Sequence, residues 1–164
     1  MEIAQITWFN TSVYKYAKAD FVLYNRTQRV LNVSWNQIVD LRNDMIMDIQ
    51  LYKMMSNEYR FFPVTVKVNA CAEFTRNTFS VQDTVFKYSN IRPCNLKPDF
   101  YYIRNGMPDF SKCPPHMPRG SYKIVWTVTF HSYLIYVLEM YGKILDKPVD
   151  WKKIPKHNWD ERFN

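Results

Sequence analysis

The side chains that most often carry out chemistry in proteins are few in this chain, and their spacing favours no catalytic centre. The three histidines, His116, His131 and His157, lie far apart, and no two of them have the spacing of metal ligands. The sequence has no Gly-x-Ser-x-Gly elbow, and its three isolated glycines cannot build a phosphate-binding loop. We therefore expect a protein that is not an enzyme and that uses no metal or cofactor.

The carboxylates and cysteines that stand out have ordinary structural explanations. Asp44 and Asp48 are four residues apart in a segment of strand periodicity, so they share its exposed face and are expected to contact solvent. Cys71, near the start of a helical segment, is expected to be bridged or buried rather than an activated thiolate. Cys71, Cys94 and Cys113 do not have the spacing of metal ligands. Because there are three of them, at most one bridge forms within the chain.

Composition and length predict one folded domain rich in strands. The chain has 164 residues, which is enough to bury its own core, and we expect a domain over residues 1–148 followed by a tail over residues 149–164. Aromatic residues make up 17% and charged residues 23%, which excludes a disordered segment. Glycines are few, whereas β-branched residues and tyrosines are abundant, a balance that favours β-structure.

The charge distribution favours neither nucleic acid nor a membrane span. The formal net charge is +7, but the lysines and arginines are scattered singly rather than gathered in a stripe, as a nucleic-acid interface would require. No run of 18 apolar residues occurs, so we expect no transmembrane segment. Solvated outer faces explain this basic surface, and a receptor or acidic partner remains the alternative use for it.

Alternation of apolar and polar residues predicts six to eight antiparallel strands and one short helix between residues 71 and 88. A turn is expected near His131 and Ser132. This pattern is typical of an antiparallel β-sandwich. Three rows of apolar side chains are expected to face its interior: Met45, Met47, Ile49 and Leu51; Val64, Val66 and Val68; and Tyr122, Ile124, Trp126, Val128 and Phe130.

These rows have two interpretations that periodicity does not separate. They can form an ordinary filled core, which is the more common use of such residues. They can also line a cup for an apolar ligand, to which flexible methionine side chains adapt well. In the second case tyrosine hydroxyls or the Trp126 N–H at the rim of the cup would orient a polar head group.

Three glycosylation sequons bear on the compartment. They are Asn10 (NTS), Asn25 (NRT) and Asn32 (NVS), against about one expected by chance. The first residues show no basic segment followed by an apolar one, which taken alone predicts a cytosolic protein. The sequons instead favour an extracellular one.

Four segments in order give a more specific likeness. They are "LYNRTQRVLNVSW", "MDIQLYKMMSNEYRFFPVTVKVNACAEF", "KYSNIRPCNL" and "MPRGSYKIVW". Through them the chain resembles, from about residue 13 to residue 145, the insect secreted family of CheA/CheB-type proteins, which are related to GM2-activator and MD-2-like lipid-recognition domains. It differs from that pattern in lacking the cysteines that relatives carry near the first strand.

The resemblance implies a GM2-activator-like cup whose two sheets enclose a lipid or hydrocarbon. In such a cup the row from Tyr122 to Phe130 would face the other two rows across the sandwich. It also implies secretion, a binding role in chemosensation of cuticular-hydrocarbon pheromones, and a disulfide between Cys71 and Cys94, with Cys94–Cys113 as the other pairing. The competing function is a protein-interaction module with a solid core, which would engage a receptor or acidic partner through its basic surface.

Overall fold

A computed structural model describes residues 1–78, 80, 82–83, 87–92, 94–107 and 117–145. The expected tail over 149–164 and Cys113 lie outside these residues. The elements in chain order are β1 (Ile3–Phe9), β2 (Tyr14–Leu23), β3 (Arg29–Gln37), β4 (Met45–Met55), β5 (Glu58–Asn69), α1 (Ala70–Arg76), β6 (Asp99–Gly106), β7 (Gly120–Phe130) and β8 (Tyr133–Ile144).

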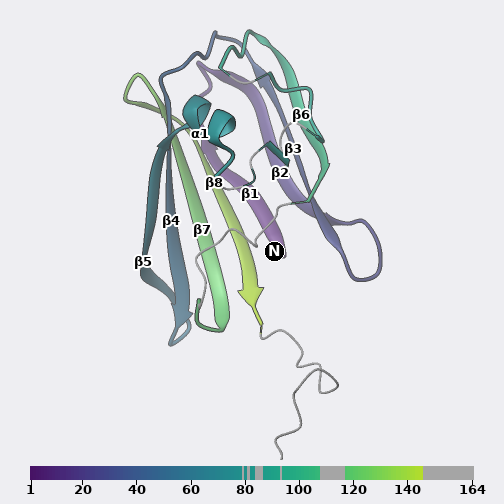
Figure 1. Ribbon diagram of the computed structural model, residues 1–164, viewed down its shortest axis with the longest axis vertical. Coiled ribbons are helices and arrows are strands. Elements are labelled where there is room, and N and C mark those ends of the chain that lie inside the picture. Colours follow the sequence, from purple (N-terminus) through teal and green to yellow (C-terminus); the bar gives the residue numbers. More distant parts are fainter. Residues whose placement is uncertain (79, 81, 84–86, 93, 108–116, 146–164) are drawn as a thin grey trace, which may run out of the picture.

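The strands form two antiparallel sheets, which confirms the expected all-β sandwich with one short helix (Figure 1). The larger sheet has the order β1-β8-β7-β4-β5, and the smaller has the order β2-β3-β6. Sequence analysis assigned no particular strand before residue 19, whereas β1 occupies residues 3–9 at the edge of the larger sheet.

The two sheets come together along one side of the molecule. The edge strands β1 and β2, which belong to different sheets, run next to each other. The opposite edge strands, β5 and β6, are the outermost strands on either side of Figure 1. Because the larger sheet has five strands and the smaller has three, their inner faces are unequal in width.

Tight turns without glycine join the longest strands. His131 and Ser132 have φ of 47° and 68°, so the β7–β8 turn lies where the sequence places it. Ser56 and Asn57 have φ of 51° and 66° between β4 and β5. Two successive positive φ values match the right-handed twist of the flanking strands, as in type I′ hairpins.

The helix α1 lies at the start of the expected segment of residues 71–88, of which residues 79, 81 and 84–86 lie outside the described part of the chain. Asn69 caps its start, because its side chain accepts a hydrogen bond from the Ala72 N–H at 3.0 Å. Asn77 ends it with φ of 53° and donates its N–H to the Glu73 carbonyl. In the described part of the chain, no helix has the length and apolar character that crossing a membrane requires.

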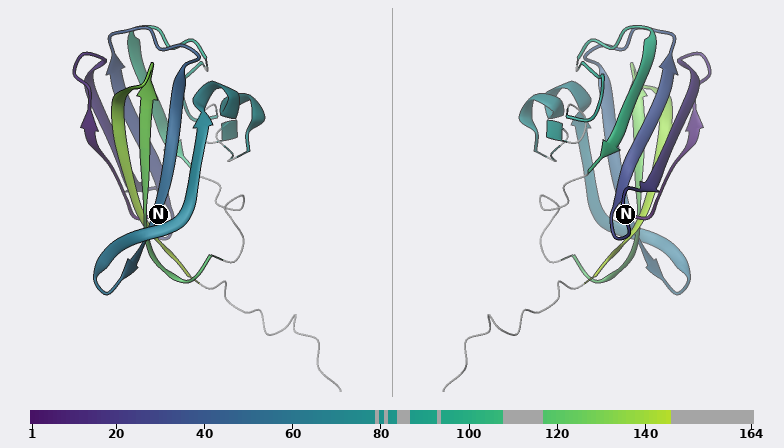
Figure 2. Two further views of the ribbon diagram at one scale, coloured as in Figure 1. Left: turned by 90° about the vertical axis from the view of Figure 1, so that its left-hand side faces the viewer. Right: turned by 90° about the vertical axis from the view of Figure 1, so that its right-hand side faces the viewer.

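One disulfide links the two sheets at the side away from β1 and β2. Cys71 and Cys94 are bonded, with their Cα atoms 5.0 Å apart, which confirms this pairing over Cys94–Cys113. Cys71 lies on α1, directly after β5, and α1 packs against β4 and β5 (Figure 2). Cys94 precedes β6, so the bond connects the two edges that are farthest from the β1–β2 junction.

A charged network stabilises the outer face of the larger sheet. Lys123 Nζ lies 3.4 Å from Glu139 Oε1, and Tyr141 donates its hydroxyl to Glu139 Oε2. The Lys123 ammonium also lies 5.0 Å from the centre of the Tyr52 ring. Burial opposes ionisation of Glu139, but the Tyr141 hydrogen bond and the Lys123 charge outweigh it and hold the pKa of Glu139 below its ordinary value.

Stability is therefore expected to fall in acid as Glu139 becomes protonated. Its pKa is lower in the folded chain than in the unfolded one, so its contribution is present at neutral pH and is lost as the pH falls below 4.5, the ordinary glutamate value. Glu139→Gln should lower the free energy of unfolding by about 2 kcal/mol at pH 7, and by less at pH 3. Urea denaturation at both pH values measures this. Glu58→Gln is the control, since the exposed Glu58 makes only a long, solvated ion pair of 3.7 Å with Arg60. Equal losses at both pH values would contradict the prediction.

Candidate ligand-binding site

The strand register places the three predicted apolar rows side by side on one face of the larger sheet, so the expectation that the β7 row faces the other two across the sandwich was wrong. The β4–β7 pairs are Met45–Phe130, Met47–Val128, Ile49–Trp126 and Leu51–Ile124, and the β4–β5 pairs include Met47–Val68 and Ile49–Val66. Residues directly opposite each other in neighbouring strands point to the same side. This side faces the smaller sheet, and its residues fall into three groups.

The first group packs against the smaller sheet near the α1 end. Met45, Met47 and Val128 are buried in one cluster with Tyr101 and Ile103 of β6. Three more of the predicted residues pack against it: Val68, Trp126 and Phe130. In this part of the sandwich the two inner faces form an ordinary core.

The second group lies toward the β1–β2 junction. Ile124 packs against a buried cluster that includes Ala4 of β1, Phe21 of β2 and Met140 of β8. Trp126 contacts this cluster as well as the first, so it lies at the centre of the inner face rather than at a rim.

The third group lies on β4, β5 and β7, away from that junction. We call it the β4–β5–β7 patch; its members are Ile49, Leu51, Phe62, Val64, Val66 and Tyr122. Ile49, Leu51 and Tyr122 are buried, and the other three are half-buried. Among the described residues, neither cluster that joins the sheets includes a member of this patch.

Phe62 is the member of the patch that sequence analysis missed. Its ring packs edge-on against Tyr122, with ring centres 5.5 Å apart, and Tyr122 donates its hydroxyl to the Pro118 carbonyl at 2.7 Å. The register shifts between Gln50 and Tyr52, so β5 bulges at this point. The period of two that includes Val64 and Val66 extends back to Phe62, so this part of the signal was present in the sequence.

The Trp126 N–H is a buried polar group on this inner face. Its Nε1 has no hydrogen-bond partner among the described residues. Trp126 lies directly opposite Ile49 of the patch. A buried donor without a partner costs about 1–3 kcal/mol, so a ligand that carries an acceptor would be favoured here.

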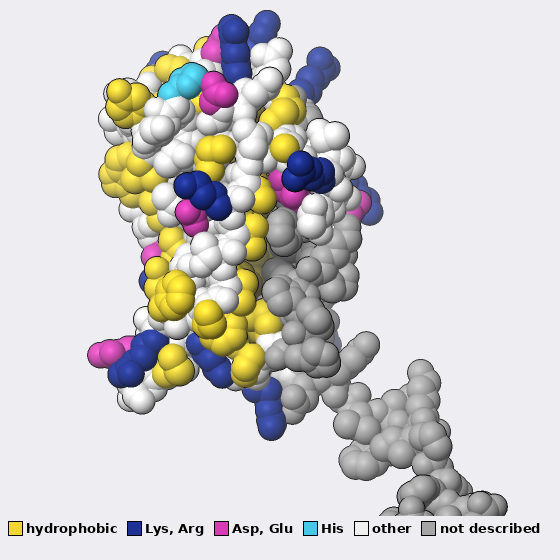
Figure 3. Space-filling view, turned by 60° about the vertical axis from the view of Figure 1, so that its left-hand side comes forward, with side chains coloured by type: hydrophobic (Ala, Val, Ile, Leu, Met, Phe, Trp, Pro, Cys, Tyr) yellow, Lys and Arg dark blue, Asp and Glu magenta, His cyan; other side chains and the backbone are white. Residues whose placement is uncertain are grey.

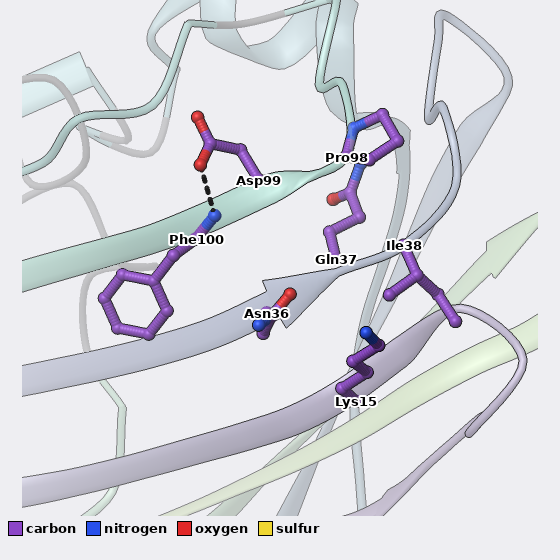
Figure 4. Close-up of a pocket in the computed structure, with 7 residues that line it drawn as sticks. All are labelled: Lys15, Asn36, Gln37, Ile38, Pro98, Asp99 and Phe100. Carbon is purple, nitrogen blue, oxygen red and sulfur yellow. Dashed lines mark hydrogen bonds between the residues drawn. The ribbon is translucent and has the colours of Figure 1, made fainter.

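Two depressions lie on the smaller sheet, and neither was predicted from the sequence. One, of about 560 Å³, is lined by Lys15, Asn36, Gln37, Ile38, Pro98, Asp99 and Phe100 (Figure 4). The other, of about 510 Å³, follows the outward faces of β2, β3 and β6. In the first, the Gln37 amide donates to the Leu96 carbonyl at 2.7 Å, and Asp99 accepts from the Phe100 N–H at 2.7 Å. These bonds hold the chain in place before β6. We therefore attribute the polar groups of the first depression to stabilisation of the fold rather than to ligand binding.

The reactive side chains singled out in the sequence lie apart from the inner face. His131 Nδ1 is 3.2 Å from Asp44 Oδ2, and both side chains are more than half exposed. Asp48 lies within β4, whereas Asp44 is the residue just before it. The two carboxylates therefore do not lie on the same strand. No group of three potential metal ligands comes together in the part of the chain that the structure describes.

Basic side chains do not form a stripe on the face in Figure 3. Lysine and arginine side chains lie apart from one another there, among acidic, apolar and uncharged ones. Elsewhere on the surface, Lys18 pairs with Asp20 and Arg60 pairs with Glu58 in exposed ion pairs. Such pairs are solvated and contribute little to stability.

The three sequons occupy different settings. Asn10 accepts a hydrogen bond from the Ser12 N–H in the β1–β2 turn, and Asn25 accepts from the Thr27 and Gln28 N–H groups in the β2–β3 turn. Asn32 lies within β3, where its Oδ1 accepts from the Asn105 N–H at 2.7 Å.

One family model matches the chain, over residues 45–124, and its description is "Protein of unknown function (DUF1091)". The matched segment runs from the first residue of β4 into β7, so it contains the whole β4–β5–β7 patch and both cysteines of the disulfide. No curated protein shows significant similarity to the chain.

Proposed function

We propose that the protein is a non-enzymatic, extracellular binding protein for a hydrophobic, lipid-like ligand, which lies against the β4–β5–β7 patch between the two sheets. The observation that carries this proposal is the position of the patch. Its six apolar side chains face inward, yet none belongs to the clusters that pack the sheets together in the described residues. An alkyl chain is the complementary partner for such a surface.

Burial of the ligand supplies enough free energy without specific polar contacts. Each methylene removed from water contributes about 0.8 kcal/mol, so a ten-carbon tail supplies ~8 kcal/mol before ordering costs. The disulfide supports this function because it holds the β5 and β6 edges at a set distance on the patch side. A fixed cup loses less conformational entropy when it binds.

The biological setting follows from the resemblance to the CheA/CheB-type and GM2-activator/MD-2-like proteins. That resemblance supports secretion, with a role in perception of cuticular-hydrocarbon pheromones. A disulfide is also most common in oxidising compartments, and the sequons at Asn10, Asn25 and Asn32 are usable only there.

Titration of the purified chain with a fluorescent fatty acid tests the proposed function. We expect saturable binding at one site, with an affinity that is nearly the same at 50 mM and 500 mM salt, because burial of apolar surface is insensitive to screening. Affinity that falls steeply with salt would instead point to an acidic partner bound by the basic surface, and no saturation would contradict the proposal.

The Trp126 indole provides a second test. Trp126→Phe removes the unpartnered N–H. We expect the affinity for a fatty acid to fall by about tenfold, which corresponds to one hydrogen bond of ~1.4 kcal/mol. The affinity for a plain alkane of equal length should be unchanged. Competition of each ligand against the fluorescent probe measures this. Trp35→Phe is the control, since Trp35 stacks on Tyr101 in the first cluster. Equal losses for acid and alkane would show that Trp126 acts only by packing.

A further inference from the structure

The outward face of the smaller sheet carries a groove that the proposed ligand site does not use. Its volume is about 510 Å³, within the range of about 300–1,000 Å³ that is usual for small-molecule sites. Asn32 and Ser34 of β3 form its floor, between residues of β2 and β6.

The groove combines exposed aromatic rings with polar side chains. Tyr16 and Phe100 are each 44% exposed. Tyr102 lies under the Arg104 guanidinium, which is 4.4 Å from the ring centre. Ring faces pack against the C–H faces of sugars, while neighbouring charged and amide groups bond to hydroxyls. The lining is therefore suited to a carbohydrate rather than to an alkyl chain.

A glycosylation sequon lies on the floor of this groove. Asn32 and Ser34 alternate with Val33, which packs inward against the core, so both sequon side chains face outward. Ser34 is directly opposite Tyr102 of β6. The Asn32 Oδ1 accepts a hydrogen bond from the Asn105 N–H. A glycan is attached to Nδ2, so this bond persists in the glycosylated residue and fixes the direction of the first sugar.

We propose that Asn32 carries an N-linked glycan whose first sugars lie in this groove, over the rings of Tyr16, Phe100 and Tyr102. The occupant is thus the chain's own carbohydrate, and it covers an aromatic face that would otherwise be exposed to water. Asn10 and Asn25 differ, because their side chains cap turns at the ends of strands, away from this groove. This inference rests on the extracellular route in the proposed function.

Mass spectrometry of the full chain, fused to a cleavable secretory leader and recovered from the medium of eukaryotic cells, tests the proposal. Peptides treated with a glycosidase that leaves aspartate at the attachment site report occupancy of each sequon. Hydroxyl-radical footprinting then compares wild type with Ser34→Ala, which removes the sequon and keeps the Asn32–Asn105 bond. Thr27→Ala, which removes the Asn25 sequon, is the matched control.

We expect Asn32 to be occupied, and oxidation of Tyr16, Phe100 and Tyr102 to be at least threefold slower in wild type than in Ser34→Ala. Thr27→Ala should match wild type, and Tyr133, exposed on the other sheet, should react equally in all three. An unmodified Asn32, or an occupied one with equal oxidation rates, would overturn the proposal. Fatty-acid titration of unglycosylated chain made in bacteria tests the proposed function separately.

Discussion

Replacement of Val66 by tryptophan is expected to lower the affinity for a fluorescent fatty acid about thirtyfold. Val66 is a half-buried member of the β4–β5–β7 patch on the edge strand β5, directly opposite Ile49. An indole at this position would occupy the space of two or three ligand methylenes, each worth about 0.8 kcal/mol, so the loss is about 2 kcal/mol. Titration at a single salt concentration measures it.

Thr65→Trp is the matched control, since Thr65 is the neighbouring residue on β5 and points to the outer, exposed face. Both variants add the same side chain to the same strand. Thr65→Trp also removes the hydrogen bond from the Thr65 hydroxyl to Gln50, so the control carries at least as large a perturbation of the strand. The control should bind like wild type. If both variants bind normally, or if both lose affinity to the same extent, the ligand does not lie on the patch.

Loss of the Cys71–Cys94 bridge should lower the free energy of unfolding by ~3 kcal/mol, as expected for a loop closed over a sequence separation of 23 residues. The bond ties α1 to the segment before β6. The double variant Cys71→Ser, Cys94→Ser is therefore also expected to bind the fatty acid more weakly, because the two sheet edges are then joined only through the core.

Urea denaturation of the double variant, next to wild type with and without a reducing agent, measures the stability. Reduced wild type should match the variant. Cys113→Ser is the control and should be close to wild type, because Cys113 takes no part in this bond. A loss below 1 kcal/mol in the double variant would contradict the structural role of the bridge.

The strands were predicted well where one face of the strand is exposed to solvent. Met45, Met47 and Ile49 alternate with polar residues, and a period of two leaves them no other common face. The turn at His131 and Ser132 was located without glycine because the strand patterns on either side end there. The pairing of Cys71 with Cys94 came from the resemblance, since three cysteines alone leave the choice open.

Other features depend on contacts that a local pattern does not contain. Asn77 takes a left-handed conformation and ends α1 after Arg76, a boundary within residues 71–88 that no glycine or proline marks in the sequence. Phe62 packs against Tyr122 of β7, a strand that the sequence places far from β5 and that only the strand order brings near it. The division of the inner face into core and patch follows from the pairing of a five-stranded sheet with a three-stranded one, which appears only when the strand order is known.

The groove around Asn32 illustrates the same limit. Tyr16, Asn32 and Phe100 come from three separate strands, and only the β2-β3-β6 order brings them together. The sequon itself was visible in the sequence, but its aromatic surroundings were not.

Native mass spectrometry of the unglycosylated full chain, incubated with an equimolar fatty acid, asks whether the interior accepts a ligand at all. We expect a mass increase of one ligand per chain in wild type and Thr65→Trp, and a much smaller bound fraction in Val66→Trp. A wild-type chain that keeps the mass of the polypeptide alone, at every ligand concentration tried, would show that the space beside the patch is closed to an alkyl chain.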